Sequence, residues 1–219
     1  MYFHQDQAGH KIDLPPGKVV CVGRNYMAHI RELNNELPDE ALLFIKPSTA
    51  LCSLAQPLVI PKGKGSCHNE IELAVLIGAP LCNTTEYEAK SAIYGIGLGL
   101  DLTLRDMQEK LKSKGHPWER AKAFDYSCPV SGFVASADVN FAQDIEFNLQ
   151  VNGEIRQQGS SKDMMRTITA LLVEISQSFT LLPGDIVLTG TPKGVGPLNA
   201  GDRLAGALTG HFIIETQVL

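Results

Sequence analysis

The sequence predicts a strand-rich protein of the α+β class, and three stretches support this prediction. Residues 145–151 alternate strictly between apolar and polar side chains, and the Asn152-Gly153 pair that follows is typical of a tight hairpin turn. Large apolar residues also occupy every second position from 71 to 77, as in a strand with one face in the core. Between 163 and 179 apolar residues recur at helical spacing, which predicts a helix packed on that core.

The N-terminal part of the chain predicts two short strands with a helix and a loop between them. The apolar run 18–22, closed by Gly23, favours a buried strand. Residues 24–33 place their apolar side chains on one helical face and predict a turn or two of helix. Residues 34–40 are polar and contain Asn-Asn and Leu-Pro-Asp, so we expect a mobile lid over a binding site. The second strand is expected at 41–45.

Further elements are expected in the middle of the chain. Residues 58–61 indicate the end of a strand, which a flexible turn joins to the strand at 71–77. A capping-box pattern, T-x-x-E, predicts a helix over 85–92. The apolar, glycine-rich run 93–100 predicts another strand, and a helix is expected within 102–111.

The C-terminal part predicts strands at 186–188 and 212–216, with a glycine-rich loop after the first of them. This loop, residues 189–197, lacks the G-K-[ST] sequence of phosphate-binding loops. Two interpretations stay open. The loop brings backbone N–H groups or the Thr191 hydroxyl to a ligand, or it makes a tight turn between two strands.

Two acidic side chains share one face of the strand at 71–77. Glu70 and Glu72 alternate with the apolar residues, so they lie on the opposite face, roughly 6.6 to 6.8 Å apart along the backbone. Asp101 follows the strand at 93–100. Three carboxylates form an all-oxygen set that suits Mg²⁺ or Mn²⁺. The alternative is that the glutamates line the solvated face of an edge strand and that Asp101 caps a helix.

Three other positions in the sequence are candidate functional groups. His29 and Glu32 lie one helical turn apart, which either orients a general base or makes an ordinary surface pair. Arg105 and Gln108 also lie one turn apart and could reach an anionic substrate. Lys122 has apolar neighbours, so it either extends its stem over the surface or has a functional role.

Composition limits the kinds of partner. The chain of 219 residues can form one core, so we expect a single domain over 1–219. A net charge of −5 without a basic cluster argues against nucleic acid. No apolar run is long enough to cross a membrane, and residues 1–11 are unlike a signal peptide, so a cytoplasmic protein with a small-molecule partner is expected. Five cysteines without a C-x-x-C pair predict reduced thiols.

Taken together, six motifs give the chain a resemblance to a known family. They are V-G-R-N-Y-x-x-H-x-x-E at 22–32, F-I-K-P at 44–47, H-x-E-x-E-L at 68–73, D-L-T-x-R-D at 101–106, K-x-F-D at 122–125 and L-T-G-T-P-x-G-V-G-P at 188–197. In this order they resemble the fumarylacetoacetate hydrolase family, most closely its short acylpyruvate hydrolase branch.

The resemblance implies a fold and a set of site residues. The fold is a mixed β-sandwich roll with flanking helices, usually present as a homodimer. The family's site residues comprise metal ligands, catalytic groups and substrate contacts. They fall on Glu70, Glu72 and Asp101 for the metal, on His29, Glu32 and Lys122 for catalysis, and on Arg105, Gln108 and Thr191 for the substrate. One departure is Asn69, where relatives often carry a second histidine.

The resemblance also implies an activity. We expect a Mg²⁺-dependent hydrolase, with Mn²⁺ as the alternative ion, that cleaves a carbon–carbon bond in acylpyruvates, which are 2,4-dioxo acids. His29, oriented by Glu32, would activate water. Two alternatives use 2-oxo acids and the same enolate chemistry: an oxaloacetate decarboxylase, and a keto–enol isomerase or tautomerase. A non-catalytic, metal-stabilised binding protein is a further alternative.

Overall fold

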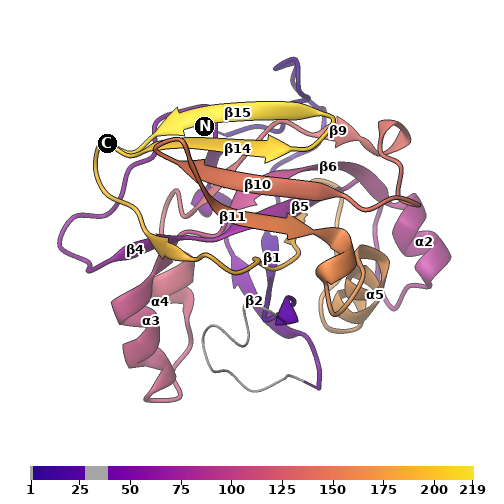
Figure 1. Cartoon of the computed structure of the whole chain (residues 1–219). Coiled ribbons are helices and arrows are strands. Elements are labelled where there is room, and N and C mark those ends of the chain that lie inside the picture. Colours follow the sequence, from indigo (N-terminus) through magenta and orange to yellow (C-terminus); the bar gives the residue numbers. More distant parts are fainter. Residues whose placement is uncertain (1, 28–38) are drawn as a thin grey trace.

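Three β-sheets with short helices around them form the part of the chain that the structure, a computed structural model, describes, namely residues 2–27 and 39–219 (Figure 1). The strands are β1 (Val19–Gly23), β2 (Leu42–Lys46), β3 (Leu51–Ser53), β4 (Cys67–Asn69), β5 (Ile71–Ile77), β6 (Ile93–Leu100), β7 (Thr103–Leu104), β8 (Cys128–Val130), β9 (Val134–Ala135), β10 (Glu146–Val151), β11 (Glu154–Ser160), β12 (Ile186–Leu188), β13 (Gly196–Pro197), β14 (Arg203–Leu208) and β15 (Phe212–Gln217). The α-helices that lie wholly within the described residues are α2 (Glu86–Ser91), α3 (Arg105–Lys112), α4 (Glu119–Lys122) and α5 (Ile168–Ser178). The 3₁₀ helices are η1 (Ser48–Ala50), η2 (Ser136–Asp138) and η3 (Ser161–Asp163). The predicted strand-rich α+β class is confirmed.

The largest sheet places β5 in its interior. The strand order is β2-β1-β12-β5-β6-β8-β3, with β9 paired to β6. β5 pairs antiparallel with β12 on one side and with β6 on the other. β5 is therefore not an edge strand, and the alternative in which Glu70 and Glu72 line a solvated edge is wrong.

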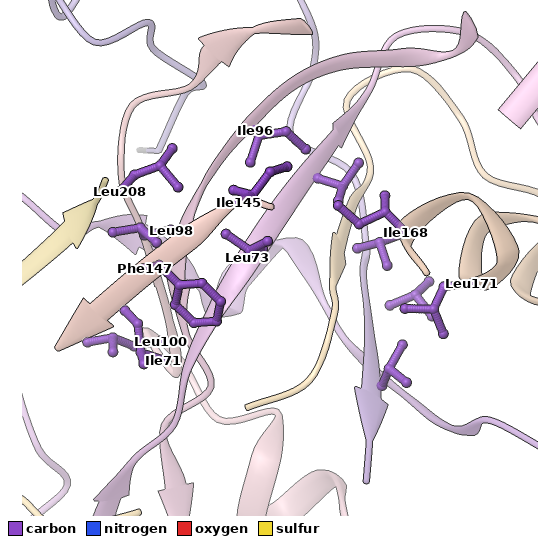
Figure 2. Close-up of a cluster of buried hydrophobic side chains, with 14 of the residues drawn as sticks. Ile71, Leu73, Ile96, Leu98, Leu100, Ile145, Phe147, Ile168, Leu171 and Leu208 are labelled. Carbon is purple, nitrogen blue, oxygen red and sulfur yellow. The ribbon is translucent and has the colours of Figure 1, made fainter. Parts of the chain in front are cut away.

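The two faces of β5 pack into different clusters of apolar side chains. All seven residues of the strand are buried. Ile71 and Leu73 pack in the main core with Leu98 of β6, Phe147 of β10 and other apolar residues (Figure 2). Ala74 and Leu76 belong to a second cluster. Because side chains alternate along a strand, Glu72 lies on the face of Ala74 and Leu76, as its spacing predicts.

The predicted hairpin is formed by β10 and β11, and it belongs to a four-stranded sheet of order β11-β10-β14-β15 that packs on the large sheet (Figures 1 and 2). Asn152 (φ 55°) and Gly153 (φ 84°) both adopt the left-handed conformation that a two-residue turn requires. Arg156 is an extra residue in β11, because Leu149 pairs with Gln157 while Gln150 pairs with Ile155. This β-bulge changes which side chains of β11 face inward.

Several predicted boundaries are wrong. Residues 24–26 are not helical, since Arg24 has φ 59° and Tyr26 makes a single bridge to Met164, and residues 28–33 of that prediction lie outside the described residues. Residues 58–61 contain only an isolated bridge, from Leu58 to Val218. The helix expected from residue 163 begins at Ile168, and the helix within 102–111 begins at Arg105. β14 was not predicted, because three small residues, Ala205, Gly206 and Ala207, separate its two leucines.

Residues 34–38 of the predicted lid lie outside the described residues, and the lid stays a prediction. Among the described helices, none is both long and apolar enough to cross a membrane. All five cysteines are free thiols, and Cys21, Cys67 and Cys128 are buried.

Candidate active site

A pocket forms where the beginning of β5 meets the end of β6. The two strands are antiparallel with Ile71 paired to Leu100, so the residues that flank this pair, Glu70 and Asp101, become neighbours. The Asp101 backbone N–H donates to the Glu70 carbonyl at 2.8 Å. The strand pairing thus brings together carboxylates about thirty positions apart in the chain. The pocket holds about 480 Å³ of space, part of it open to solvent.

Three buried carboxylates form the floor of the pocket. Glu70, Glu72 and Asp101 are 6%, 2% and 1% exposed, and one oxygen from each lies within 4.8 Å of the others. Burial, together with the charges of Asp101 and Glu70, raises the pKa of Glu72 well above its ordinary value. Such a set of like charges is expensive to bury without a cation. The donor chemistry, all carboxylate oxygen, fits a hard divalent ion such as Mg²⁺ or Mn²⁺.

Lys122 lies among these carboxylates rather than over the protein surface. Its Nζ donates to Glu70 Oε2 at 2.8 Å, to Asp101 Oδ2 at 2.5 Å and to Thr103 Oγ1 at 2.6 Å. Burial alone would lower the pKa of Lys122, but the charges of Asp101 and Glu70 outweigh it and raise this pKa. The interpretation of Lys122 as a stem extended over the surface is therefore wrong. Its ammonium group is placed to contact any ligand bound at the carboxylates.

Arg105 and Gln108 line the same pocket from the first turns of α3. The guanidinium of Arg105 forms an ion pair with Glu70, and its Nη1 donates to Gln108 Oε1 at 2.5 Å. The predicted neighbours one turn apart are therefore in contact. The rings of Phe44 and Trp118 also line the pocket and pack at 6.0 Å between centroids, which gives it an apolar part.

The glycine-rich loop after β12 contributes both a backbone N–H and Thr191. The N–H of Gly190 donates to Glu72 Oε2 at 2.6 Å. Gly190 has φ 99°, and a Cβ there would lie 2.8 Å from Cβ of Asn25, so the position requires glycine. The Thr191 hydroxyl lines the pocket and donates to the Ile71 carbonyl at 2.8 Å. The loop therefore lies against the carboxylates, and its contact with a ligand stays a prediction.

Lys46 and Gln157 are two of the residues around the pocket that the sequence analysis missed. Lys46 is fully buried, and its Nζ lies 2.9 Å from Asp101 Oδ1. It is part of the F-I-K-P motif, and a lysine that ends an otherwise apolar strand is a signal that could have identified it. Gln157 is 1% exposed, and no pattern in the sequence marks it.

Gln157 connects β5 to the glycine-rich loop. Its Oε1 accepts from the Ile71 backbone N–H at 2.9 Å and from Asn69 Nδ2 at 2.7 Å. Its Nε2 donates to Thr191 Oγ1 at 2.8 Å and to the Pro192 carbonyl at 2.9 Å. Because the Thr191 hydroxyl accepts from Gln157, its own proton points to Ile71. Gln157 therefore fixes the orientation of this hydroxyl.

Gln157→Leu is expected to lower the free energy of unfolding by about 3 kcal/mol or more, because several buried polar groups lose a partner at once. Urea unfolding would measure this change. Gln158→Leu is the matched control, because Gln158 is the exposed neighbour on the same strand and should change stability by less than about 0.5 kcal/mol. Equal effects of the two substitutions would contradict the role given to Gln157.

The structure thus brings together seven of the nine predicted site residues. Glu70, Glu72, Asp101, Lys122, Arg105, Gln108 and Thr191 all line the pocket. His29 and Glu32 lie outside the described residues, and their pairing stays a prediction.

A pocket in which buried carboxylates meet a lysine and an arginine is typical of enzymes, because charged groups with perturbed pKa values gather at functional sites. Residues 18–219 match the family described as Fumarylacetoacetate (FAA) hydrolase C-terminal, and the chain belongs to this enzyme family.

Three known proteins are similar over nearly the whole chain. Oxaloacetate tautomerase YcgM of Escherichia coli (strain K12) is 54% identical over 220 residues, which cover 100% of both chains. A putative fumarylacetoacetate hydrolase family protein from Yersinia pestis CO92 superposes with a TM-score of 0.97 at 52% identity and 100% coverage of both chains. Fumarylpyruvate hydrolase from Pseudomonas aeruginosa, crystallised with Mn²⁺ and pyruvate, has a TM-score of 0.92 at 34% identity, covering 98% of this chain and 94% of that one.

These comparisons confirm the predicted family. They do not confirm its acylpyruvate hydrolase branch, because the relative with 54% identity is named an oxaloacetate tautomerase and the fumarylpyruvate hydrolase is a more distant neighbour.

Proposed function

We propose that this protein is a divalent-metal-dependent tautomerase that interconverts the enol and keto forms of oxaloacetate. The main structural support is the contact of Lys122 with Glu70 and Asp101, which places an ammonium group beside a cluster of three buried carboxylates. The full-length similarity to an oxaloacetate tautomerase supports the choice of substrate and reaction. Sequence analysis alone placed acylpyruvate hydrolysis first, with oxaloacetate decarboxylation or keto–enol tautomerisation as the alternative.

The chain's own residues would bind and orient the 2-oxo acid. Glu70, Glu72 and Asp101 would hold Mg²⁺ or Mn²⁺, and the bound ion would supply positive charge that makes the protons on C3 more acidic. Arg105 and Gln108 would hold the C1 carboxylate, because a guanidinium and an amide donate hydrogen bonds to carboxylate oxygens. Thr191, its proton held by the Ile71 carbonyl, offers an oxygen atom to the pocket.

Tautomerisation moves one proton from the oxygen on C2 to C3. Lys122 would donate a hydrogen bond to the C2 oxygen as negative charge develops there, which is the role of a preorganised electrostatic stabiliser. In ketonisation the enol hydroxyl would release its proton to solvent, and His29, oriented by Glu32, would deliver a proton to C3 as the general acid. In enolisation His29 would take the C3 proton as the general base, and the C2 oxygen would gain one from solvent. The same residues serve both directions, because the proton that leaves C3 in enolisation returns to it in ketonisation.

Acylpyruvate hydrolysis is a second candidate, and the similarity to the fumarylpyruvate hydrolase from Pseudomonas aeruginosa favours it. Hydrolysis also develops negative charge at the C2 oxygen, so Lys122 and the carboxylates would have the same roles. It needs one further component, a water molecule activated by His29. Tautomerisation needs proton transfers alone, and the two reactions differ in their products.

The proposal predicts that the Mg²⁺-loaded protein accelerates conversion of enol-oxaloacetate to the keto form, followed by the fall in enol absorbance in the ultraviolet. A chelator should remove the acceleration, and added Mg²⁺ should restore it. In parallel, NMR would identify the products formed from acetylpyruvate and fumarylpyruvate. Efficient cleavage of either one, with no acceleration of oxaloacetate tautomerisation, would contradict the proposal and favour the hydrolase.

A further inference from the structure

Each N–H group of the Lys122 ammonium already has an acceptor. Lys122 Nζ donates to two carboxylate oxygens, Glu70 Oε2 at 2.8 Å and Asp101 Oδ2 at 2.5 Å. Its third acceptor is the hydroxyl of Thr103, at 2.6 Å. A lysine ammonium has three N–H groups, so these three contacts use all of them. A ligand in the pocket can therefore receive a hydrogen bond from Lys122 only if one of the three contacts is released.

Thr103 reaches Lys122 because side chains alternate in direction between β6 and α3. Asp101, Thr103 and Arg105 occupy every second position, and the two leucines between them are buried in the main core. Alternate residues of an extended segment point to opposite sides, so the three polar side chains lie on the side of the active site. Thr103 belongs to β7, which pairs with β4 and thereby holds this segment.

The Thr103 hydroxyl is oriented to accept a hydrogen bond from Lys122. Its own proton is donated to the Asp101 carbonyl at 3.0 Å, which leaves the oxygen lone pairs for the ammonium group. Thr103 is 0% exposed, so a ligand in the pocket would contact Lys122 rather than Thr103. The hydroxyl is also neutral, and it is not one of the three carboxylates that could hold a metal ion.

A metal ion would affect the three acceptors of Lys122 differently. An ion bound by Glu70 and Asp101 would share their negative charge, so both carboxylates would attract the ammonium group less strongly. The contact with the neutral Thr103 hydroxyl has no such competitor. We propose that Thr103 is a positioning residue, which keeps the ammonium group of Lys122 in place when a carboxylate contact is exchanged for the C2 oxygen of the substrate. This inference rests on the proposed function.

The test removes the hydroxyl while nearly keeping the shape of the side chain. Thr103→Val should lower kcat for oxaloacetate tautomerisation about tenfold or more at saturating Mg²⁺, because a hydrogen bond to a charged group is lost. KM should change less than about twofold, because Lys122 acts on charge that develops during the reaction. Thr103→Ser, which keeps the hydroxyl, should restore most of kcat. Calorimetry should give both variants a Mg²⁺ affinity close to that of the wild type, because the three carboxylates are unchanged.

Ser176→Ala is the matched control. Ser176 Oγ also donates to a carbonyl, that of Val173 at 2.8 Å, and accepts from an N–H group, that of Thr84 at 3.0 Å. Ser176 is buried in α5 and does not line the pocket. Loss of its hydroxyl should lower the free energy of unfolding and change kcat less than about twofold.

A binding experiment gives a readout that does not depend on turnover. Pyruvate has a neutral C2 oxygen, whereas oxalate carries negative charge at the corresponding position and so resembles the enolate. Calorimetry of the Mg²⁺-loaded protein measures the affinity for each of them. Thr103→Val should reduce the preference for oxalate over pyruvate about tenfold, and Thr103→Ser should keep it.

An unchanged oxalate preference in Thr103→Val, or equal losses in the valine and serine variants, would overturn the proposal. A fall in kcat that is accompanied by an equal fall in Mg²⁺ affinity would also overturn it, because Thr103 would then serve the metal site. If the wild-type protein fails to tautomerise oxaloacetate, the proposed function fails, and the oxalate preference still decides the role of Thr103. If Thr103→Val does not fold, Thr103→Cys takes its place, because a thiol accepts hydrogen bonds only weakly.

Discussion

Glu72→Gln is expected to remove most of the affinity for Mg²⁺ or Mn²⁺ and to lower turnover roughly a thousandfold, while the metal-free protein stays folded. Glutamine keeps the shape of the side chain and an oxygen that can accept from the Gly190 N–H. It removes one of three buried like charges: burial first, and then repulsion by Asp101 and Glu70, raise the pKa of Glu72 in the folded protein. The metal-free variant should therefore be at least as stable as the metal-free wild type.

Metal titration calorimetry and thermal unfolding with and without Mg²⁺ would measure these effects. The wild-type melting temperature should rise when the ion is added, because a ligand that binds the folded state stabilises it. The melting temperature of Glu72→Gln should respond little. Glu86→Gln serves as the control, since Glu86 is an exposed glutamate in the first turn of α2. Wild-type metal affinity in Glu72→Gln would show that the carboxylate cluster is not the metal site.

Lys122→Met is expected to separate metal binding from catalysis. Removing the ammonium takes one buried partner from each of Glu70 and Asp101, which keep their pairs with Arg105 and Lys46, so the metal-free variant should lose on the order of 3 kcal/mol of stability. A divalent ion would neutralise the same carboxylates, so its stabilising effect should be larger than in the wild type. Turnover should nevertheless fall by about a hundredfold or more, because the hydrogen bond to the C2 oxygen is lost.

The measurement pairs thermal unfolding over a series of Mg²⁺ concentrations with tautomerase kinetics at saturating metal. Lys90→Met is the control, because Lys90 is an exposed lysine in the last turn of α2. Near-normal turnover in metal-saturated Lys122→Met would assign Lys122 a structural role alone.

The placement of the carboxylates could be predicted from sequence because it depends on local periodicity. Alternation along β5 fixes which face Glu72 occupies, and the predicted strand 93–100 ends immediately before Asp101. The hairpin at Asn152-Gly153 was likewise encoded by two adjacent residues whose preferred conformation suits the turn.

The surroundings of Lys122 and Gln157 could not be predicted, because they depend on long-range packing. The carboxylate partners of Lys122 lie 52 and 21 positions away in the chain. Its apolar neighbours in the sequence therefore do not indicate that its ammonium group is surrounded by carboxylates. Gln157 faces inward because Arg156 is an extra residue in β11, and a β-bulge leaves no periodic signal. The helix predicted from residue 163 begins later, because Met164 instead bridges to Tyr26.

The backbone hydrogen bond between Asp101 and Glu70 has a consequence for ion selectivity. Both residues adjoin paired strands in the interior of a sheet, so the distance between their carboxylates is limited by the main chain. A carboxylate cluster held in this way cannot readily widen to the longer bonds and higher coordination numbers that Ca²⁺ prefers. We therefore expect the carboxylate cluster to select ions by radius. It should bind the smaller Mg²⁺ and Mn²⁺ more tightly than Ca²⁺, even though all of these ions accept oxygen ligands.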